Sequence, residues 1–382
     1  MSSLFSKATI AILTTLCALP IFSSAQLIRQ TNLVTDDQSL HPAAITDTNL
    51  KNVWGLSYSS AGPFWVSNNG SGTSTLYSVN KTTNATTKLG LTVTIPGDGS
   101  VTGQVFNATG GFHADNFLFV SEDGTVSGWR GGPTGTGTTA ETFVAGSTAN
   151  VYKGSAIATV SGHGYFYAAN FKTGNIDVIK GDVNAPSLSG NFSDPTIPAG
   201  YAPFNIQKLG NTLYVTYAVQ NGAKHDDVKG AGNGFVDAFD LNGNFLARVG
   251  SQGTLDSPWG LALAPSSFGA YAGDLLVGNF GDGRINVFNL ATDTYVAQLQ
   301  DETHTPIAID GLWALIPGNN GNAGSANNIY FSSGPDGETH GLFGTLQAVP
   351  EPGSICLFAA ACVTCVTGGL SFLRRRMTKV AK

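Results

Sequence analysis

The stretch 259–288, WGLALAPSSFGAYAGDLLVGNFGDGRINVF, holds one complete copy of the pattern that decides the fold. A short apolar strand follows Trp259, a second apolar strand ends in a polar turn, and a third begins after Gly283. Apolar residues alternate or run continuously within these strands and show no helical period, which is typical of strands buried between neighbours. The stretch therefore predicts three consecutive strands of one β-sheet.

The same order of strands and turns occurs six times along the chain. The other copies begin near Trp54, Gly103, Gly154, Pro203 and Gly311. Successive copies start 49 to 56 residues apart, a period typical of propeller blades. A more polar fourth strand should follow each third strand except the last, and the stretch 27–34 should pair with the last blade and remove its open edge. We predict an all-β fold, a six-bladed β-propeller with four-stranded blades closed by an N-terminal strand.

Composition supports a globular β-protein. The chain has 382 residues with 49 Gly and 16 Pro, only 12% charged residues and 42% hydrophobic residues, which disfavours a helical fold and allows a large core. Residues 26–352 carry 13 basic against 25 acidic side chains and no cysteine. An acidic surface repels phosphates, so nucleic acid and anionic lipid headgroups are poor partners, while cations and neutral ligands remain possible. Without cysteines, this part of the chain can have neither a disulfide core nor a thiolate metal site.

Both ends of the chain resemble export signals. Residues 1–25 place Lys7 before the apolar run 8–22 and end in small residues, which predicts a signal peptide removed by signal peptidase; a buried first helix is the alternative. Residues 354–373 are uncharged and long enough for one transmembrane helix of about 30 Å. The arginines after this run predict a cytoplasmic C-terminus, with the body of the protein across the membrane.

The tail 348–382 resembles the PEP-CTERM sorting signal of Gram-negative bacteria. The residues that carry the resemblance are Val349, Pro350, Glu351, Pro352, Arg374, Arg375 and Arg376. This resemblance implies processing by an exosortase-like enzyme and release of the body to the cell surface, often in bacteria that make extracellular polysaccharide. A permanent single-span anchor is the alternative. The predicted domains are the signal peptide 1–25, the propeller 26–347 and the sorting tail 348–382.

The blade cores carry a second resemblance. Residues 278–288, GNFGDGRINVF, and 169–179, ANFKTGNIDVI, resemble NHL-type propeller repeats. More broadly, most of the mature chain resembles a family of uncharacterised exported bacterial proteins that bear this sorting tail. This resemblance implies the propeller architecture and no particular activity.

Polar residues recur at the turn between the second and third strands, where a propeller opens its central channel. Aligning the repeats places Asn68, Glu122, Asn170, Tyr217, Asn279 and Ser333 at this turn, with Asn69 and Asp123 beside them. Their oxygens could hold Ca²⁺ or orient a sugar. Alternatively, Asn, Asp and Gly stand there because tight turns require them.

Three further groups are candidate sites. The insertion 221–232 carries His225, Asp226 and Asp227 and could form a lid or cation site, or a solvated loop. Asp336, Glu338 and His340 alternate, so in an extended segment they would share one face and could bind a metal or act as acid and base, unless they belong to an exposed turn. Trp54, Trp259 and Trp313 could stack on sugars or pack between blades.

Sequence motifs for named chemistry are missing. The chain has no Gly-x-Ser-x-Gly elbow, His-Glu-x-x-His helix or phosphate-binding Gly-Lys-Ser/Thr motif. We therefore expect a non-catalytic surface or matrix protein that binds an extracellular polysaccharide, a cation or a surface protein through the propeller mouth. A metal-dependent propeller enzyme, either a lactonase-like hydrolase or a polysaccharide lyase, is the alternative.

Overall fold

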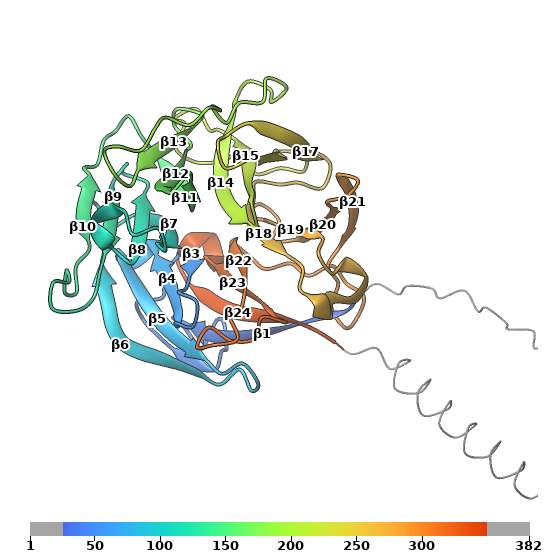
Figure 1. The fold of residues 1–382 in the computed structure, drawn as a ribbon. Helices are drawn as coiled ribbons and strands as arrows, with labels where there is room; N and C mark the ends of the chain where they lie inside the picture. The colour runs from blue at the N-terminus through green and yellow to red at the C-terminus, as the bar shows by residue number, and fades with distance from the viewer. Residues whose placement is uncertain (1–25, 350–382) are drawn as a thin grey trace, which may run out of the picture.

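The computed structural model describes residues 26–349, which form six β-sheets arranged in a ring (Figure 1). Each predicted repeat builds one sheet, so the six-bladed propeller is confirmed. The first blade contains β3 (Val53–Ser57), β4 (Phe64–Asn68), β5 (Thr73–Val79) and β6 (Thr86–Thr94). The second contains β7 (Val101–Phe106), β8 (Phe117–Ser121), β9 (Val126–Trp129) and β10 (Glu141–Val144). The third contains β11 (Tyr152–Val160), β12 (His163–Asn170) and β13 (Asn175–Lys180). The next two contain β14 (Tyr201–Leu209), β15 (Thr212–Val219), β16 (Gly234–Phe239) and β17 (Phe245–Ser251); and β18 (Pro258–Leu263), β19 (Leu275–Asn279), β20 (Ile285–Asn289) and β21 (Thr294–Gln298).

The sixth blade joins the two ends of the described chain. Its strands are β22 (Leu312–Pro317), β23 (Ile329–Ser333) and β24 (Leu342–Ala348), followed by β1 (Ile28–Thr35) and β2 (Ile45–Thr46). β1 pairs antiparallel with β24, from Ile28 opposite Ala348 to Thr35 opposite Leu342. The predicted closure by an N-terminal strand is therefore confirmed, and β24 has no open edge.

The first strand of each blade lies innermost, and these strands contact one another around the central channel. Each inner strand carries a bulge or register shift near its start, where the backbones of adjacent blades approach closely. A Cβ on Gly103 would lie 2.7 Å from the Ser155 backbone nitrogen, and one on Gly55 would lie 2.7 Å from the Thr102 carbonyl oxygen. The repeated glycine is therefore needed to bring neighbouring blades together.

The third blade departs from the prediction of four strands. Only β11, β12 and β13 pair in this sheet, and residues 181–200 continue without a strand of their own. This segment contains Pro186, Pro195 and Pro198, and proline cannot donate a hydrogen bond to a strand ladder. It instead buries Phe192 against the outer part of the third and fourth blades.

The predicted signal peptide and most of the sorting tail lie outside the described residues. Val349 is the last described residue, and its backbone nitrogen donates to the Leu27 carbonyl oxygen at 2.8 Å. Within residues 26–349 we find no helix with the length and apolar character that a membrane crossing needs. The span predicted at 354–373 is outside that range.

Candidate ligand site at the mouth of the channel

A buried aromatic layer fills the channel at the end where the turns between second and third strands lie. We call this end the mouth and the other end the opposite mouth. Trp54 and Trp313 stack with ring centroids 3.4 Å apart, and Phe280 stacks on Trp313 at 3.9 Å. Trp259 meets Trp54 edge-on at 6.2 Å, and none of these four side chains is more than 4% exposed. The three tryptophans are therefore packed on one another and offer no free face to a sugar. Of the two roles predicted for them, packing between blades is the one observed.

Asn52 ties this aromatic layer to the polar groups above it. Its Oδ1 accepts hydrogen bonds from the indole nitrogens of Trp54, at 3.1 Å, and Trp313, at 3.3 Å. Its Nδ2 donates to Asn69 Oδ1 at 3.2 Å and to Glu338 Oε2 at 2.8 Å. One amide thus fixes the orientation of two indoles and one carboxylate. The sequence analysis missed Asn52, which precedes the repeat.

A buried lysine lies at the centre of the mouth. Lys153 is 2% exposed, and its ammonium lies 5.2 Å from the centre of the Trp54 ring. It donates a hydrogen bond to Glu122 Oε1 and lies 3.7 Å from Asp226 Oδ1. Glu122 Oε2 accepts a second hydrogen bond from Asn69 Nδ2 at 3.0 Å. Paired in this way, the ammonium can stay buried, because buried charges require partners.

Lys153 was also missed by the sequence analysis, although the repeats contain a signal for it. Trp54, Trp259 and Trp313 each stand one residue before the position where the backbones of adjacent blades approach closely. Strand pairing places Lys153 at the equivalent position of the third repeat. Three of the other five repeats have tryptophan here, and the second and fourth have Thr102 and Phe204. A lysine at this position is a departure from the repeat, and such departures indicate function.

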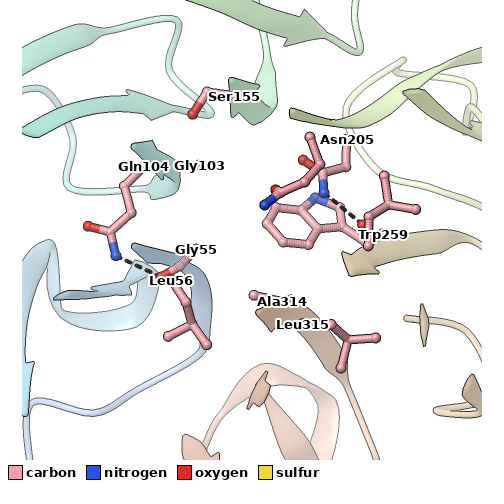
Figure 2. A pocket seen from close by; sticks show the side chains of 11 residues that line it. Gly55, Leu56, Gly103, Gln104, Ser155, Asn205, Trp259, Ala314 and Leu315 are labelled. Atoms are coloured by element: carbon pink, nitrogen blue, oxygen red, sulfur yellow. Dashed lines mark hydrogen bonds between the residues drawn. The ribbon is translucent and has the colours of Figure 1, made fainter. Parts of the chain in front are cut away.

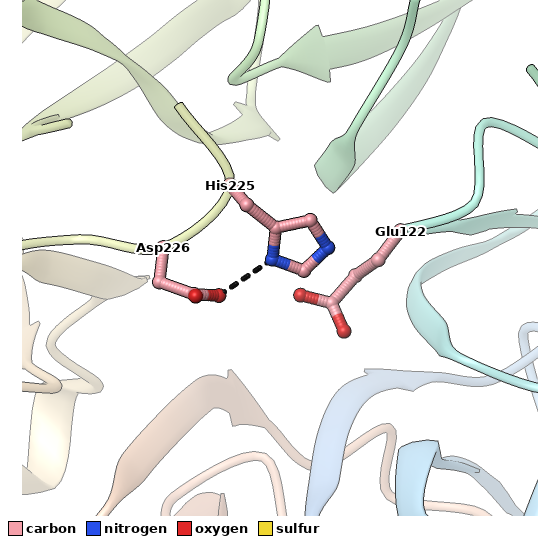
Figure 3. Close-up of side chains that lie close together, drawn as sticks. All are labelled: Glu122, His225 and Asp226. Atoms are coloured by element: carbon pink, nitrogen blue, oxygen red, sulfur yellow. Dashed lines mark hydrogen bonds and ion pairs between the residues drawn. The ribbon is translucent and has the colours of Figure 1, made fainter. Parts of the chain in front are cut away.

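The insertion 221–232 brings two more polar side chains, His225 and Asp226, to the mouth. His225 Nδ1 and Asp226 Oδ1 are 2.7 Å apart, and the ring of His225 lies between Asp226 and Glu122 (Figure 3). One ligand atom from each of Glu122, His225 and Asp226 lies within 4.8 Å of the other two. The prediction that this insertion could act as a lid or cation site therefore has a geometric basis. We name Glu122, Lys153, His225 and Asp226 the mouth cluster.

Beside the mouth cluster lies a hollow of about 450 Å³. Its walls come from the turn after β8, the link between the second and third blades and the insertion. The charged residues that line it are Asp98, Glu122, Asp123, Lys172 and His225. Ser147, Thr148 and Asn150 add neutral polar groups. The hollow is therefore polar and carries more carboxylates than cations.

The carboxyl groups near the mouth differ in their pKa. Burial opposes ionisation of Asp226, but the His225 hydrogen bond and the Lys153 ammonium outweigh it and lower its pKa. Burial raises the pKa of Glu338, and the Glu122 carboxylate raises it further against the opposing hydrogen bond from Asn52. Burial also raises the pKa of Asp227, whose Oδ2 has no hydrogen-bond partner among the described residues. Asp226 is thus more readily ionised than Asp227 or Glu338.

The predicted polar ring does not line the channel. Asn68, Asn170 and Asn279 are fully buried and bind their own hairpins: Asn68 donates to Thr75 at 3.0 Å, Asn170 to Asp177 at 2.8 Å and Asn279 to Asp282 at 2.9 Å. Ser333 is buried as well. These contacts agree with the alternative interpretation, in which the polar residues stand here because tight turns require them.

Glu122 was aligned one position away from the rest of the ring. Strand pairing gives the equivalent place to Ser121, which pairs with Val101 just before the register shift of the inner strand, as Asn68 pairs with Val53. Tyr217, opposite Pro203, stands at the ring position as aligned. Tyr217 is 4% exposed, and burial raises the pKa of its hydroxyl far above the usual value. Glu122 follows the strand end, so its carboxylate reaches the mouth while the ring residues do not.

Asp336, Glu338 and His340 do not converge on one point. Pro335–Glu338 forms the short turn α1, with left-handed backbone at Asp336 and Glu338, so the segment is not extended. Asp336 pairs with His41 at 2.7 Å, His340 with Asp36 at 3.0 Å, and Glu338 with Asn52. This predicted metal or acid–base set is therefore divided among three partners.

Comparison with known proteins finds relatives in a giant virus. No family model matches the chain. The uncharacterised protein R648 of Acanthamoeba polyphaga mimivirus is 32% identical over 321 residues, which is 80% of this chain and 76% of R648. The uncharacterised protein L690 of the same virus is 37% identical over 52% of this chain and 51% of its own length.

Solved structures share the general architecture. A streptogramin B lyase matches with a TM-score of 0.44 and 11% identity over 84% of this chain and 97% of its own. An aldose sugar dehydrogenase from Streptomyces coelicolor matches with a TM-score of 0.49 and 16% identity over 84% of this chain and 98% of its own. Similarity at this level carries no information about activity.

These relatives correct two predictions made from the sequence. The assignment to an exported bacterial family with a sorting tail is contradicted, and so is localisation at the surface of a Gram-negative bacterium, because the relatives found are proteins of an amoeba virus. The assignment was based on the tail 348–382 together with blade-core and turn segments. Blade segments report how a blade is built and not where the protein is found, and residues 350–382 lie outside the described residues. The signal-peptidase and exosortase partners depended on that assignment, and we do not propose them. The chain belongs to the family of the uncharacterised mimivirus protein R648.

Proposed function

We propose that this protein is a non-catalytic binding protein whose ligand occupies the hollow beside the mouth cluster. The observation that carries this proposal is the internal pairing of the charged groups at the mouth. Glu122 is held by Lys153 and Asn69, and Asp226 by His225. Rigid, paired side chains are suited to recognition, because little conformational entropy is lost when a ligand arrives.

The hollow favours a ligand rich in hydrogen-bond donors. Asp98, Glu122 and Asp123 line it against a single lysine, Lys172, and the body of the protein is acidic overall. An anionic ligand would be repelled, whereas hydroxyl and amine groups would find carboxylate acceptors. A hydroxylated, amine-bearing molecule such as a glucosamine oligomer has the matching chemistry.

Calorimetry with a glucosamine trimer tests the proposal. We expect saturable binding of one trimer per protein, weakened about tenfold in Glu122→Gln, since a charged hydrogen bond contributes about 1.5–3 kcal/mol. Glu302→Gln is the matched control, because Glu302 pairs with the exposed Arg29 and lies outside the mouth cluster. Absence of saturable heat, or equal weakening in both variants, would reject a ligand site at the mouth.

A metal-dependent enzyme is the second candidate, favoured by the convergence of Glu122, His225 and Asp226. A histidine with two carboxylates suits Zn²⁺ or Mn²⁺ better than Ca²⁺, which prefers oxygen ligands alone. The Lys153 ammonium opposes this candidate, because it already contacts Glu122 and lies near Asp226. A bound divalent cation would sit against its positive charge.

Metal titrations distinguish the two candidates. Under our proposal, Ca²⁺, Mn²⁺ and Zn²⁺ bind weakly or not at all in calorimetry. Tight binding of one ion per protein, lost in both Glu122→Gln and His225→Ala, would favour the enzyme.

A further inference from the structure

A second recess enters the channel from the opposite mouth. It has a volume of about 230 Å³ and is lined by residues of the inner strands β3, β7, β11, β14 and β22. Leu56, Gln104, Ser155 and Gln207 continue from it into a deeper cavity of about 10 Å³, which ends at Trp259. The two spaces form one funnel that narrows toward the aromatic layer, and we call it the funnel.

Three buried polar atoms along the funnel lack hydrogen-bond partners among residues 26–349. They are Trp259 Nε1, Ser155 Oγ and Ser57 Oγ, in side chains that belong to residues only 4%, 6% and 6% exposed. Figure 2 shows the Trp259 indole reaching across the channel beside Asn205. A buried donor or acceptor without a partner costs about 1–3 kcal/mol. Such groups are common where a ligand completes the hydrogen bonding.

The other polar groups at the narrow end are already satisfied. Gln104 Nε2 donates to the carbonyl oxygens of Gly55, at 2.8 Å, and Trp65, at 2.6 Å. Asn205 Nδ2 donates to the Trp259 carbonyl oxygen at 2.7 Å. These amides therefore hold the walls in place, and the indole and the two hydroxyls are the groups left for recognition.

We propose that the funnel binds a small, neutral, polyhydroxylated molecule about the size of one sugar ring. Among the described residues no carboxylate lines it, and its single charged lining residue, Lys208, lies at the exposed rim. Leu56, Ile157 and Ile316 supply apolar walls. The narrow end has room for only about one oxygen atom, so a single ligand hydroxyl enters it and accepts from the Trp259 indole. The ring itself stays in the wider recess, where the Ser57 and Ser155 hydroxyls accept from or donate to its other hydroxyls. This site is separate from the acidic hollow at the mouth.

The test follows indole signals by NMR in the full-length protein labelled with ¹⁵N in its tryptophans. Titration with myo-inositol, and separately with D-glucose, should shift one indole N–H signal in a saturable manner. The shift should be retained in Glu122→Gln, which alters only the mouth. Ser155→Ala should weaken binding about tenfold, whereas Ser121→Ala, which also removes a buried unpartnered hydroxyl but at the mouth, should not.

Trp259→Phe would identify the shifting signal by its disappearance. Because Trp259 packs on Trp54 and Trp313, that variant could fail to fold, and the Ser155→Ala measurement then decides alone. Three outcomes would overturn the proposal: no indole signal shifts, binding is equal in Ser155→Ala and the parent protein, or the Trp259 N–H shows contact only with a long-lived water.

Discussion

At the scale of single residues, Lys153 has the largest predicted effect on stability. Replacing it with methionine keeps the apolar contact with Trp54 and leaves Glu122 buried without its cation. Breaking one partner of a buried ion pair costs about 3–5 kcal/mol, and we expect the lower end because Glu122 is 14% exposed. Urea denaturation of Lys153→Met measures this loss. The double variant with Glu122→Gln should recover most of it, and a double variant as unstable as the single one would contradict the pairing.

A second residue-scale prediction concerns Asp237 and pH. Asp237 is fully buried and shares Arg248 with Asp194; burial raises its pKa to about 7, against the opposing effect of Arg248. The folded protein therefore holds this proton more tightly than the unfolded chain, whose aspartate has a pKa near 3.8. The contribution of Asp237 to the free energy of unfolding is greatest below about pH 4 and falls as the pH rises to about 7.

The Asp237→Asn variant removes this titration. Comparing its unfolding free energy with that of the parent protein between pH 4 and 8 should show that the parent loses stability relative to the variant up to about pH 7 and no further. A difference that is constant across this range would mean that Asp237 is ionised throughout. Asp240→Asn is a suitable control, since the pKa of Asp240, in an exposed turn, is lowered by its hydrogen bonds with Asn244.

At the scale of elements, β1 should contribute more stability than its length suggests. Ile28, Leu33 and Val34 are at most 1% exposed, and each fully buried aliphatic side chain contributes about 1.5–3 kcal/mol. Removing residues 26–35 also exposes the edge of β24 to pairing with other chains. We expect the truncated protein to unfold or aggregate at room temperature, as light scattering and circular dichroism would show. Arg29→Ala with Gln30→Ala, two exposed positions of β1, should change the unfolding free energy by less than about 0.5 kcal/mol. Normal stability of the truncated form would contradict the closure.

Most of the element pattern could be predicted from the sequence, because each blade repeats one order of strands, and four of the six blades have a glycine where the inner strands approach closely. Strand pairing within blades follows directly from that order. The missing fourth strand of the third blade was not predicted, although the prolines of 181–200 argue against one. Differences in turn length explain why Glu122 was aligned with the polar ring. The repeated position is Ser121, and Glu122, which reaches the mouth, follows it by one residue.

The mouth cluster could be predicted only in part. The insertion 221–232 was placed at the correct mouth, and His225 and Asp226 were named. Its contact with Glu122 depends on how the loop folds across the channel, which no local pattern encodes. Asn52 acts through contacts between blades far apart in the chain, so neither residue type nor spacing indicated it. Lys153 could have been noticed, because it stands at a repeat position that three other blades fill with tryptophan.

At the scale of the whole molecule, the described residues form a closed ring whose channel is blocked by tryptophans and has a different polar recess at each end. The mouth is acidic and internally paired, and the opposite mouth is neutral and has unpartnered polar atoms. A ring fixed by β1 and by glycine contacts changes little in shape on binding, so ligands should order loops without moving blades.

Hydrogen exchange with and without saturating glucosamine trimer tests the central claim most directly, because it reports where on the propeller the ligand acts. We predict slower exchange confined to the loops that surround the hollow, 95–100, 122–125, 146–150 and 221–232, with the blade strands unchanged. Slower exchange at the opposite mouth or the outer edges, with these loops unaffected, would contradict the claim that the mouth is the ligand site.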